Sequence, residues 1–107
     1  MDSFVRESKI IVDRPKGTVH PRTGGIIYPV DYGHLENTKS SDNSEIDVFV
    51  GSAKNQDLDA VICSVDLCKR DCEIKLLIGC DDKEKEAVLK IFSECFDALQ
   101  GILVNRK

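Results

Sequence analysis

The chain is organised around one stretch, Tyr28-Pro29-Val30-Asp31-Tyr32-Gly33. It places two phenol hydroxyl groups beside a rigid proline turn, and two carboxylates, Asp42 and Asp47, follow on the way into the apolar residues 46–50. Carboxylates bind Mg²⁺ through a few oxygens, while phenols and basic side chains bind phosphate oxygens. The stretch therefore predicts a site for a hydrated divalent cation and a phosphate, held by the rest of the chain.

The composition is that of an ordinary globular domain. The chain has 107 residues, of which 41% are hydrophobic and 32% are charged, and this balance is typical of folded proteins rather than of disordered or membrane chains. No apolar run approaches the ~20 residues that a spanning helix needs. The first residues lack the basic start and apolar core of a secretory signal. We therefore expect a single domain over residues 1–107, located in the cytoplasm.

The charge of the chain argues against nucleic acid as a partner. The net charge is −4 at pH 7, which provides no general attraction for a phosphate backbone. Binding of single strands would also need exposed aromatic side chains in a basic groove, and the chain has only four Phe, two Tyr and no Trp. We expect neither a nucleic-acid partner nor a membrane partner.

The cysteines and histidines form no recognisable ligand pattern. The odd number of Cys, five, argues against a disulfide framework. Zinc binding by Cys63, Cys68 and Cys72 is conceivable, but the spacing is not that of paired zinc knuckles. Small buried side chains on strands are the favoured interpretation of the cysteines. His20 and His34 are expected to lie alone in loops, with a surface or hinge role.

Short extended segments are predicted over most of the chain. Apolar and β-branched residues form runs separated by polar turns, which is typical of strands. The expected strands are residues 8–13, 26–28, 46–51, 58–66, 72–79 and 102–104. The polar residues 33–45 are expected to be a loop, long enough to suggest a function.

One amphipathic helix is predicted over residues 82–100. Its apolar residues recur at i, i+3, i+4 and i+7, so they form one stripe. Asp81 or Asp82 can cap its start and Gly101 can end it. The charged residues of the segment 83–90 are expected to be a solvated face. Strands with one terminal helix favour a mainly β fold, a small and partly closed barrel packed by that helix.

The central motifs resemble those of the soluble family I inorganic pyrophosphatases. The resemblance lies in the pattern Tyr-Pro-x-(Asn/Asp)-Tyr-Gly, in Thr38 five residues after its glycine, and in Asp42 and Asp47 before a Val-rich strand. A pattern of this length rarely arises by chance. It implies a five-stranded OB-like barrel whose acidic pocket binds Mg²⁺, with Mn²⁺ as a substitute. The implied reaction is hydrolysis of pyrophosphate, or of another small diphosphate, and the resemblance also favours a homo-oligomer.

The first strand supports the same resemblance. Residues 9–17 read Lys-Ile-Ile-Val-Asp-Arg-Pro-Lys-Gly, which is similar to the opening segment of that family. His20-Pro21, ahead of the Tyr-Pro motif, resembles the family's short branch. The similarity covers residues 9–51 well and the remainder only loosely.

Candidate site residues follow from this resemblance and from their neighbours in the motifs. The expected metal ligands are Asp42, Asp47, Asp66 and Asp71. The expected substrate contacts are Lys9, Arg14, Arg22 and Lys75. The expected catalytic residues are Tyr32, Glu45 and Asp47.

Simpler interpretations of some of these residues stay open. Asp42 can be a turn residue, and Asp66 and Asp71 can merely flank a hairpin. Arg14 and Arg22 can be solvated turn residues. Asp47 is harder to dismiss because aspartate is depleted in strands.

The chain also departs from the family pattern. Ser44 stands where the acidic loop of the family has its middle aspartate, and Glu45 is the nearest substitute. Ile11 replaces a first-strand glutamate, Asp31 replaces the motif's asparagine, and Lys75 comes two positions late. These departures leave three hypotheses: a Mg²⁺-dependent pyrophosphatase with weak or altered activity, a hydrolase of another diphosphate, and a binding module that has lost catalysis.

Overall fold

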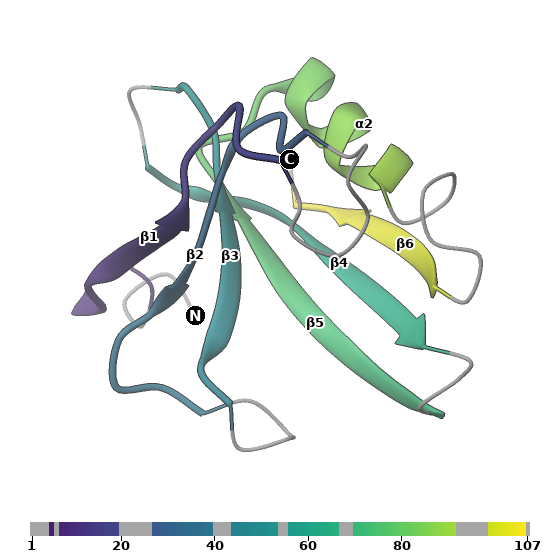
Figure 1. The fold of residues 1–107 in the computed structure, drawn as a ribbon, viewed down its shortest axis with the longest axis horizontal. Coiled ribbons are helices and arrows are strands. Elements are labelled where there is room, and N and C mark those ends of the chain that lie inside the picture. The colour runs from purple at the N-terminus through teal and green to yellow at the C-terminus, as the bar shows by residue number, and fades with distance from the viewer. Residues whose placement is uncertain are drawn as a thin grey trace.

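The computed structural model describes residues 5, 7–19, 27–39, 44–53, 56–66, 70–91 and 99–106, without the side chains of residues 66, 71, 99 and 100. Within these residues, six strands form one sheet in the order β1-β2-β3-β5-β4-β6. The strands are β1 (Ile10–Arg14), β2 (Asp31–Leu35), β3 (Ile46–Val50), β4 (Leu58–Asp66), β5 (Asp71–Ile78) and β6 (Leu99–Asn105). Helix α2 (Asp82–Lys90) lies over one end of the sheet, close to β6 (Figure 1).

The topology confirms the predicted mainly β class. Strands β3 and β5 run parallel, and all other neighbouring pairs are antiparallel. The sheet is strongly curved, with β1 to β3 on one side and the long strands β4 and β5 on the other (Figure 1). This arrangement is of the OB-like kind, in which five strands curl into a partly open barrel. The described residues form six strands where five were expected, because β6 adds a strand beside β4.

Strand β2 lies where the sequence predicted the start of a loop. Residues 33–35 pair with β1 on one side and with β3 on the other, so their backbone groups are satisfied by the sheet despite the polar sequence. Gly33 lies between Val12 and Val48 in these ladders. A Cβ at Gly33 would overlap the carbonyl group of Ile11. The glycine of the central motif therefore allows β1 to approach β2 closely.

The start of helix α2 confirms the expected cap at Asp81. The Asp81 carboxylate accepts a hydrogen bond of 2.8 Å from the backbone N–H of Glu84, and the Glu84 carboxylate accepts one of 3.0 Å from the N–H of Asp81. This reciprocal capping box satisfies two N–H groups at the end of the helix. Glu84 also accepts a hydrogen bond from the N–H of Ser52, at 3.0 Å. The cap thus ties the helix to the segment that follows β3.

The predicted end of the helix is wrong. Leu99 and Gln100 belong to β6, where they pair with Asp66 and Val65 of β4. Gly101, expected to end the helix, is an interior residue of the same strand. The helical periodicity was a local signal, and pairing with β4 overrides it at residues 99 and 100. Residues 92–98 lie outside the described residues.

The charged segment 83–90 is not solvated throughout. Lys85 is only 6% exposed, which corrects the expected solvated face at this position. Its ammonium group lies 3.9 Å from the carboxylate of Asp82. A lysine side chain can bury its hydrocarbon stem against apolar neighbours while the charged end reaches outward.

Two apolar clusters pack on opposite sides of the sheet, because neighbouring residues of a strand face opposite ways. The first contains Tyr28, Val30, Phe49, Ala60, Ile62, Leu77, Cys80, Val88 and Ile91. The second contains Val5, Leu35, Val48, Leu58, Leu76 and Ile78. Helix α2 contributes Val88 to the first cluster, as the apolar stripe predicted. Over the described residues, no helix is long and apolar enough to span a membrane.

The outer face of β5, β4 and β6 carries exposed apolar residues. Ile74, Cys63 and Ile102 are aligned across these three strands, and Ile74 and Ile102 are 57% and 69% exposed. Cys80 is buried, as expected for the cysteines, but Cys72 is exposed and contradicts that interpretation. The expected homo-oligomer stays a prediction, with this face as its candidate contact.

Candidate functional site

Three strands bring polar side chains to one concave face of the sheet. His34 pairs with Asp47 across β2 and β3, and Phe49 pairs with Leu77 across β3 and β5. Residues two apart on a strand share a face, so Asp47 and Lys75 lie side by side on the face that also holds Tyr32. This placement depends on the sheet register, because the three residues are far apart in sequence.

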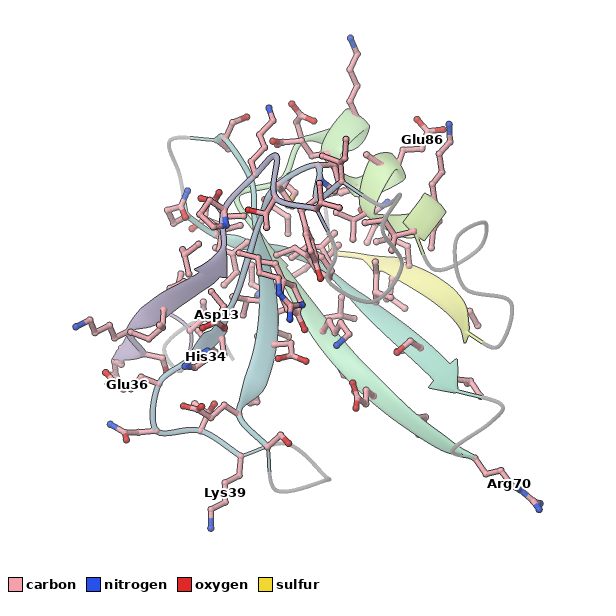
Figure 2. All side chains as sticks on the ribbon, viewed as in Figure 1. Asp13, His34, Glu36, Lys39, Arg70 and Glu86 are labelled. Carbon is pink, nitrogen blue, oxygen red and sulfur yellow. The ribbon has the colours of Figure 1, made fainter. Side chains whose placement is uncertain are left out.

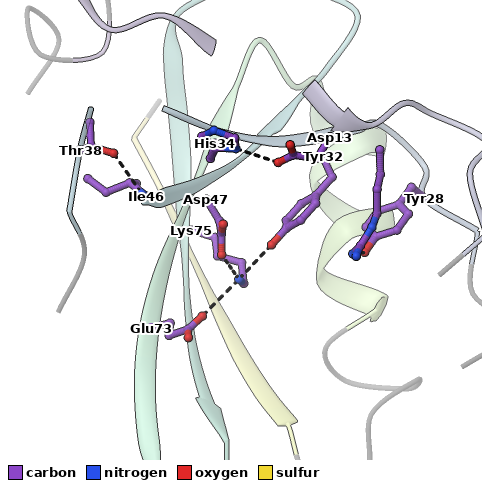
Figure 3. A network of polar contacts seen from close by, with 10 residues as sticks. Asp13, Tyr28, Tyr32, His34, Thr38, Ile46, Asp47, Glu73 and Lys75 are labelled. Atoms are coloured by element: carbon purple, nitrogen blue, oxygen red, sulfur yellow. Dashed lines mark hydrogen bonds and ion pairs between the residues drawn. The ribbon is translucent and has the colours of Figure 1, made fainter. Parts of the chain in front are cut away.

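Lys75 is the centre of this face. Its Nζ lies 2.7 Å from Asp47 Oδ2 and 3.2 Å from Glu73 Oε2. The same atom donates to the hydroxyl group of Tyr32 at 3.5 Å (Figure 3). The side chain of Lys75 is 12% exposed, and a charge so little solvated needs partners. We call Lys75, Asp47, Glu73 and Tyr32 the Lys75 cluster.

The side chain of Lys75 stays protonated. Burial acts to lower the pKa of Lys75, but its interactions with Tyr32, Asp47 and Glu73 outweigh burial and raise that pKa above its ordinary value. An ammonium group has three N–H donors, and the three contacts of the cluster match that number. Lys75 is therefore a cation at any physiological pH.

Tyr32 is held as a neutral phenol. Burial raises the pKa of Tyr32 to about 12, with the positive charge of Lys75 opposing the shift and Asp47 adding to it. The ring stacks on Tyr28 with 5.3 Å between centroids and packs at a tilt against Phe49 at 5.0 Å. These aromatic contacts fix where the hydroxyl group points.

A second cation lies at the other end of the tyrosine stack. Arg14 donates a hydrogen bond of 2.9 Å to the hydroxyl group of Tyr28. Tyr28 is only 5% exposed, so its ring is packed within the first apolar cluster. Arg14 and Lys75 thus flank the pair of tyrosine rings on either side.

His34 joins two carboxylates across the strands. Its Nδ1 lies 2.8 Å from Asp13 Oδ2, and its Nε2 lies 3.4 Å from Glu45 Oε2; Figure 2 shows His34 and Asp13 next to each other. The hydrogen bond to Asp13 raises the pKa of His34, and nearby Glu45 and Asp47 act in the same direction. The expectation that His34 lies alone in a loop is wrong, because it is a β2 residue with partners on both ring nitrogens.

The expected site residues are only partly assembled in the described structure. Tyr32, Asp47 and Lys75 come together, Arg14 reaches them through the tyrosine stack, and Glu45 contacts His34. Lys9 is exposed, just before β1 and at the opposite end of that strand from Arg14. Two further expected site residues lie outside the described part of the chain, Arg22 and Asp42.

The backbone places two further candidates near the cluster. Asp66 and Asp71 pair at the end of β4 and β5, two pairs beyond Ser64 and Glu73. Their backbone positions therefore continue the row that Glu73 and Lys75 begin. Their side chains lie outside the description.

Sequence reasoning missed three members of this face: Asp13, His34 and Glu73. Glu73 could have been found from Lys75, because strand alternation puts residues two apart on one face. The pairing of His34 with Asp13 had no such local signal, since it depends on the register of β1 against β2.

The donor set of the Lys75 cluster suits a hard divalent cation. The carboxylates of Asp47 and Glu73 converge on one positively charged atom, and Mg²⁺ is commonly held by one or two carboxylates together with substrate phosphates. No group of three or more His, Cys, Asp and Glu side chains assembles for a metal within the part of the chain that is described. The cluster thus fits Mg²⁺ only if phosphate oxygens complete its coordination.

No protein-family model matches the sequence of this chain, and no curated protein matches it significantly.

The fold has clear relatives among solved structures. An inorganic pyrophosphatase from Helicobacter pylori aligns with a TM-score of 0.65 and 14% identity over 90% of this chain and 81% of that one. An inorganic pyrophosphatase from Coxiella burnetii aligns with a TM-score of 0.59 and 12% identity over 90% of this chain and 82% of that one. An inorganic phosphatase from Anaplasma phagocytophilum aligns with a TM-score of 0.57 and 15% identity over 92% of this chain and 74% of that one. The resemblance inferred from the motifs is confirmed at the level of fold: this chain has the fold of inorganic pyrophosphatases.

Proposed function

We propose that the protein hydrolyses inorganic pyrophosphate to two phosphates with Mg²⁺ as cofactor. The observation that supports this proposal is the convergence of Asp47, Glu73 and Tyr32 on Lys75, in a fold shared with solved pyrophosphatases. Pyrophosphate is highly anionic, and the described carboxylates of this face would repel it without a metal. The proposal therefore couples the substrate to a divalent cation.

The residues of the face have distinct proposed tasks. Asp47 and Glu73 would hold Mg²⁺, with Asp42, Asp66 and Asp71 as further candidates. When bound, Mg²⁺ neutralises the diphosphate and lowers the pKa of a water molecule.

Cationic and phenol groups would then act on the phosphates. Arg14 and Lys75 would bind phosphate oxygens and stabilise the charge that moves to the leaving phosphate. Tyr32, kept neutral by its raised pKa, can donate a hydrogen bond to a phosphate oxygen. Glu45 is 46% exposed in its side chain, and we assign it to accept the proton of the attacking water as the bridging P–O bond breaks.

A second function is favoured by one contact. The carboxylate of Asp47 already has a cationic partner in Lys75, at 2.7 Å, as expected for a barrel that has lost its metal-dependent reaction. In that case the protein would bind a diphosphate or a metal without turnover. Ser44 and Ile11, which replace acidic residues of the family pattern, point the same way.

Phosphate release from pyrophosphate tests the first function. Wild type, Asp47→Ala and the exposed-surface control Glu86→Ala are assayed with Mg²⁺, with Mn²⁺ and with chelator. Metal-dependent release that Asp47→Ala abolishes and Glu86→Ala retains is the expected result. No release at any Mg²⁺ or Mn²⁺ concentration overturns hydrolysis, and calorimetric binding of pyrophosphate then tests the second function. A panel of other diphosphates separates pyrophosphate from related substrates.

A further inference from the structure

The Lys75 cluster already contains a cation of its own. The ammonium group of Lys75 contacts the carboxylates of both Asp47 and Glu73. These are the groups that would hold a divalent cation if the proposed function is correct. A metal ion and the Lys75 ammonium cannot occupy the same carboxylate oxygens at once.

We propose that Lys75 is a resident cation that a divalent ion displaces, and that the released ammonium then binds the diphosphate. This inference rests on the proposed binding of a metal and a diphosphate at this face, but not on hydrolysis. It assigns Lys75 two successive partners: carboxylates in the free protein and phosphate oxygens in the loaded one.

Charge explains why the two ligands would depend on each other. In the free protein the two carboxylates exceed the single charge of Lys75, so the cluster repels an anion. A divalent ion at the carboxylates balances both of them and leaves the charge of Lys75 in excess. The cluster then attracts an anion, and by linkage a bound anion must favour the metal by the same factor.

The contacts also predict the effect of removing either partner. Lys75→Met removes the competitor from Asp47 and Glu73, so a divalent ion alone should bind more tightly. Asp47→Asn removes a partner of Lys75, so a diphosphate should bind more tightly in the absence of metal. If the ion pair were purely structural, both variants would bind the divalent ion and the diphosphate more weakly than wild type does.

Titration calorimetry with Mn²⁺ alone, with methylenediphosphonate alone and with both together provides the test. In wild type each ligand should strengthen the other on the order of tenfold, within the usual range for coupled sites. In Lys75→Met the affinity for Mn²⁺ alone should rise several-fold and the coupling should weaken, because the charge that binds the diphosphate is missing. Lys83→Met, on the exposed side of α2, is the matched control and should behave as wild type.

Three outcomes overturn the inference. One is Mn²⁺ affinity in Lys75→Met no higher than in wild type, and another is equal affinity of wild type for the diphosphonate with and without Mn²⁺. The third is an affinity of Asp47→Asn for the diphosphonate without metal that is no higher than that of wild type. This variant decides the question if circular dichroism shows that Lys75→Met does not fold. Hydrolysis without coupling would sink this inference and leave the proposed function standing, whereas coupling without hydrolysis would do the reverse.

Discussion

Two lysines of this protein are buried to a similar degree but differ in the partners of their ammonium groups. The side chain of Lys75 is 12% exposed and has carboxylates at 2.7 and 3.2 Å. The side chain of Lys85 is 8% exposed, and its ion pair is with a fully exposed Asp82 at 3.9 Å. Burial by itself therefore does not identify a functional lysine.

The difference lies in what surrounds the ammonium group. On α2 the lysine stem covers apolar surface, and a loose contact with an exposed carboxylate adds little. On the concave face, three strands converge on one charge and constrain it from several sides. Only the second arrangement offers a site in which a ligand can compete for defined partners.

The largest expected effect comes from the framework of the concave face. Gly33→Ala places a Cβ against the backbone of Ile11 and Val12, so β1 and β2 cannot keep their spacing. We expect a loss of more than about 4 kcal/mol in the free energy of unfolding, as for other severe substitutions. Urea unfolding measures it, and a loss below about 1 kcal/mol would show that β1 packs less tightly than described.

Replacing the two lysines compares the regions directly. Lys75→Met leaves Asp47 and Glu73 without their cation, which costs about 2 kcal/mol once the partial exposure of both carboxylates is considered. Lys85→Met keeps most of the buried stem and should stay within about 0.5 kcal/mol of wild type. Parallel urea unfolding of both variants makes the comparison, and equal losses would contradict the distinction drawn between the two lysines.

The capping box of α2 should have an intermediate effect. Asp81→Ala removes the acceptor for the N–H of Glu84, and loss of an N-cap usually costs about 1 kcal/mol. Thermal unfolding followed by circular dichroism measures this loss. Asp81→Asn is the control, because asparagine is an equally good cap and should stay close to wild type.

The smallest expected effect is a pH dependence from His34. Its pKa is raised, chiefly by the hydrogen bond to Asp13 and further by Glu45 and Asp47. The folded state therefore binds the proton more tightly, so this stabilisation is complete below about pH 6.5 and is lost as the pH rises through the folded pKa. Because the side chains of Asp13 and Glu45 are each 46% exposed, we expect only a few tenths of a kcal/mol.

Unfolding of wild type and His34→Gln between pH 5 and pH 9 measures this term. The difference in stability between the two proteins should shrink as the pH rises. A difference that is constant over this range would mean that His34 does not gain a proton on folding.

The sequence predicted the class of fold better than the composition of the site. Alternating apolar runs indicated most strands, and Asp81 or Asp82 as a possible cap indicated the helix start. The signal failed where pairing decides the structure: β2 is polar yet lies between two strands, and residues 99 and 100 follow a helical period yet pair with β4. Among the site residues, Tyr32, Asp47 and Lys75 were predicted individually, but their contact was not.

By itself, the sequence determined the local features of this protein. The proline turn of the central motif and the capped start of α2 depend on residues close together in the chain. Only the tertiary structure decided that Lys75 would lie against Asp47 and Glu73, and that His34 would join Asp13 to Glu45. These contacts depend on sheet register, in which a shift of one residue would turn each side chain to the other face.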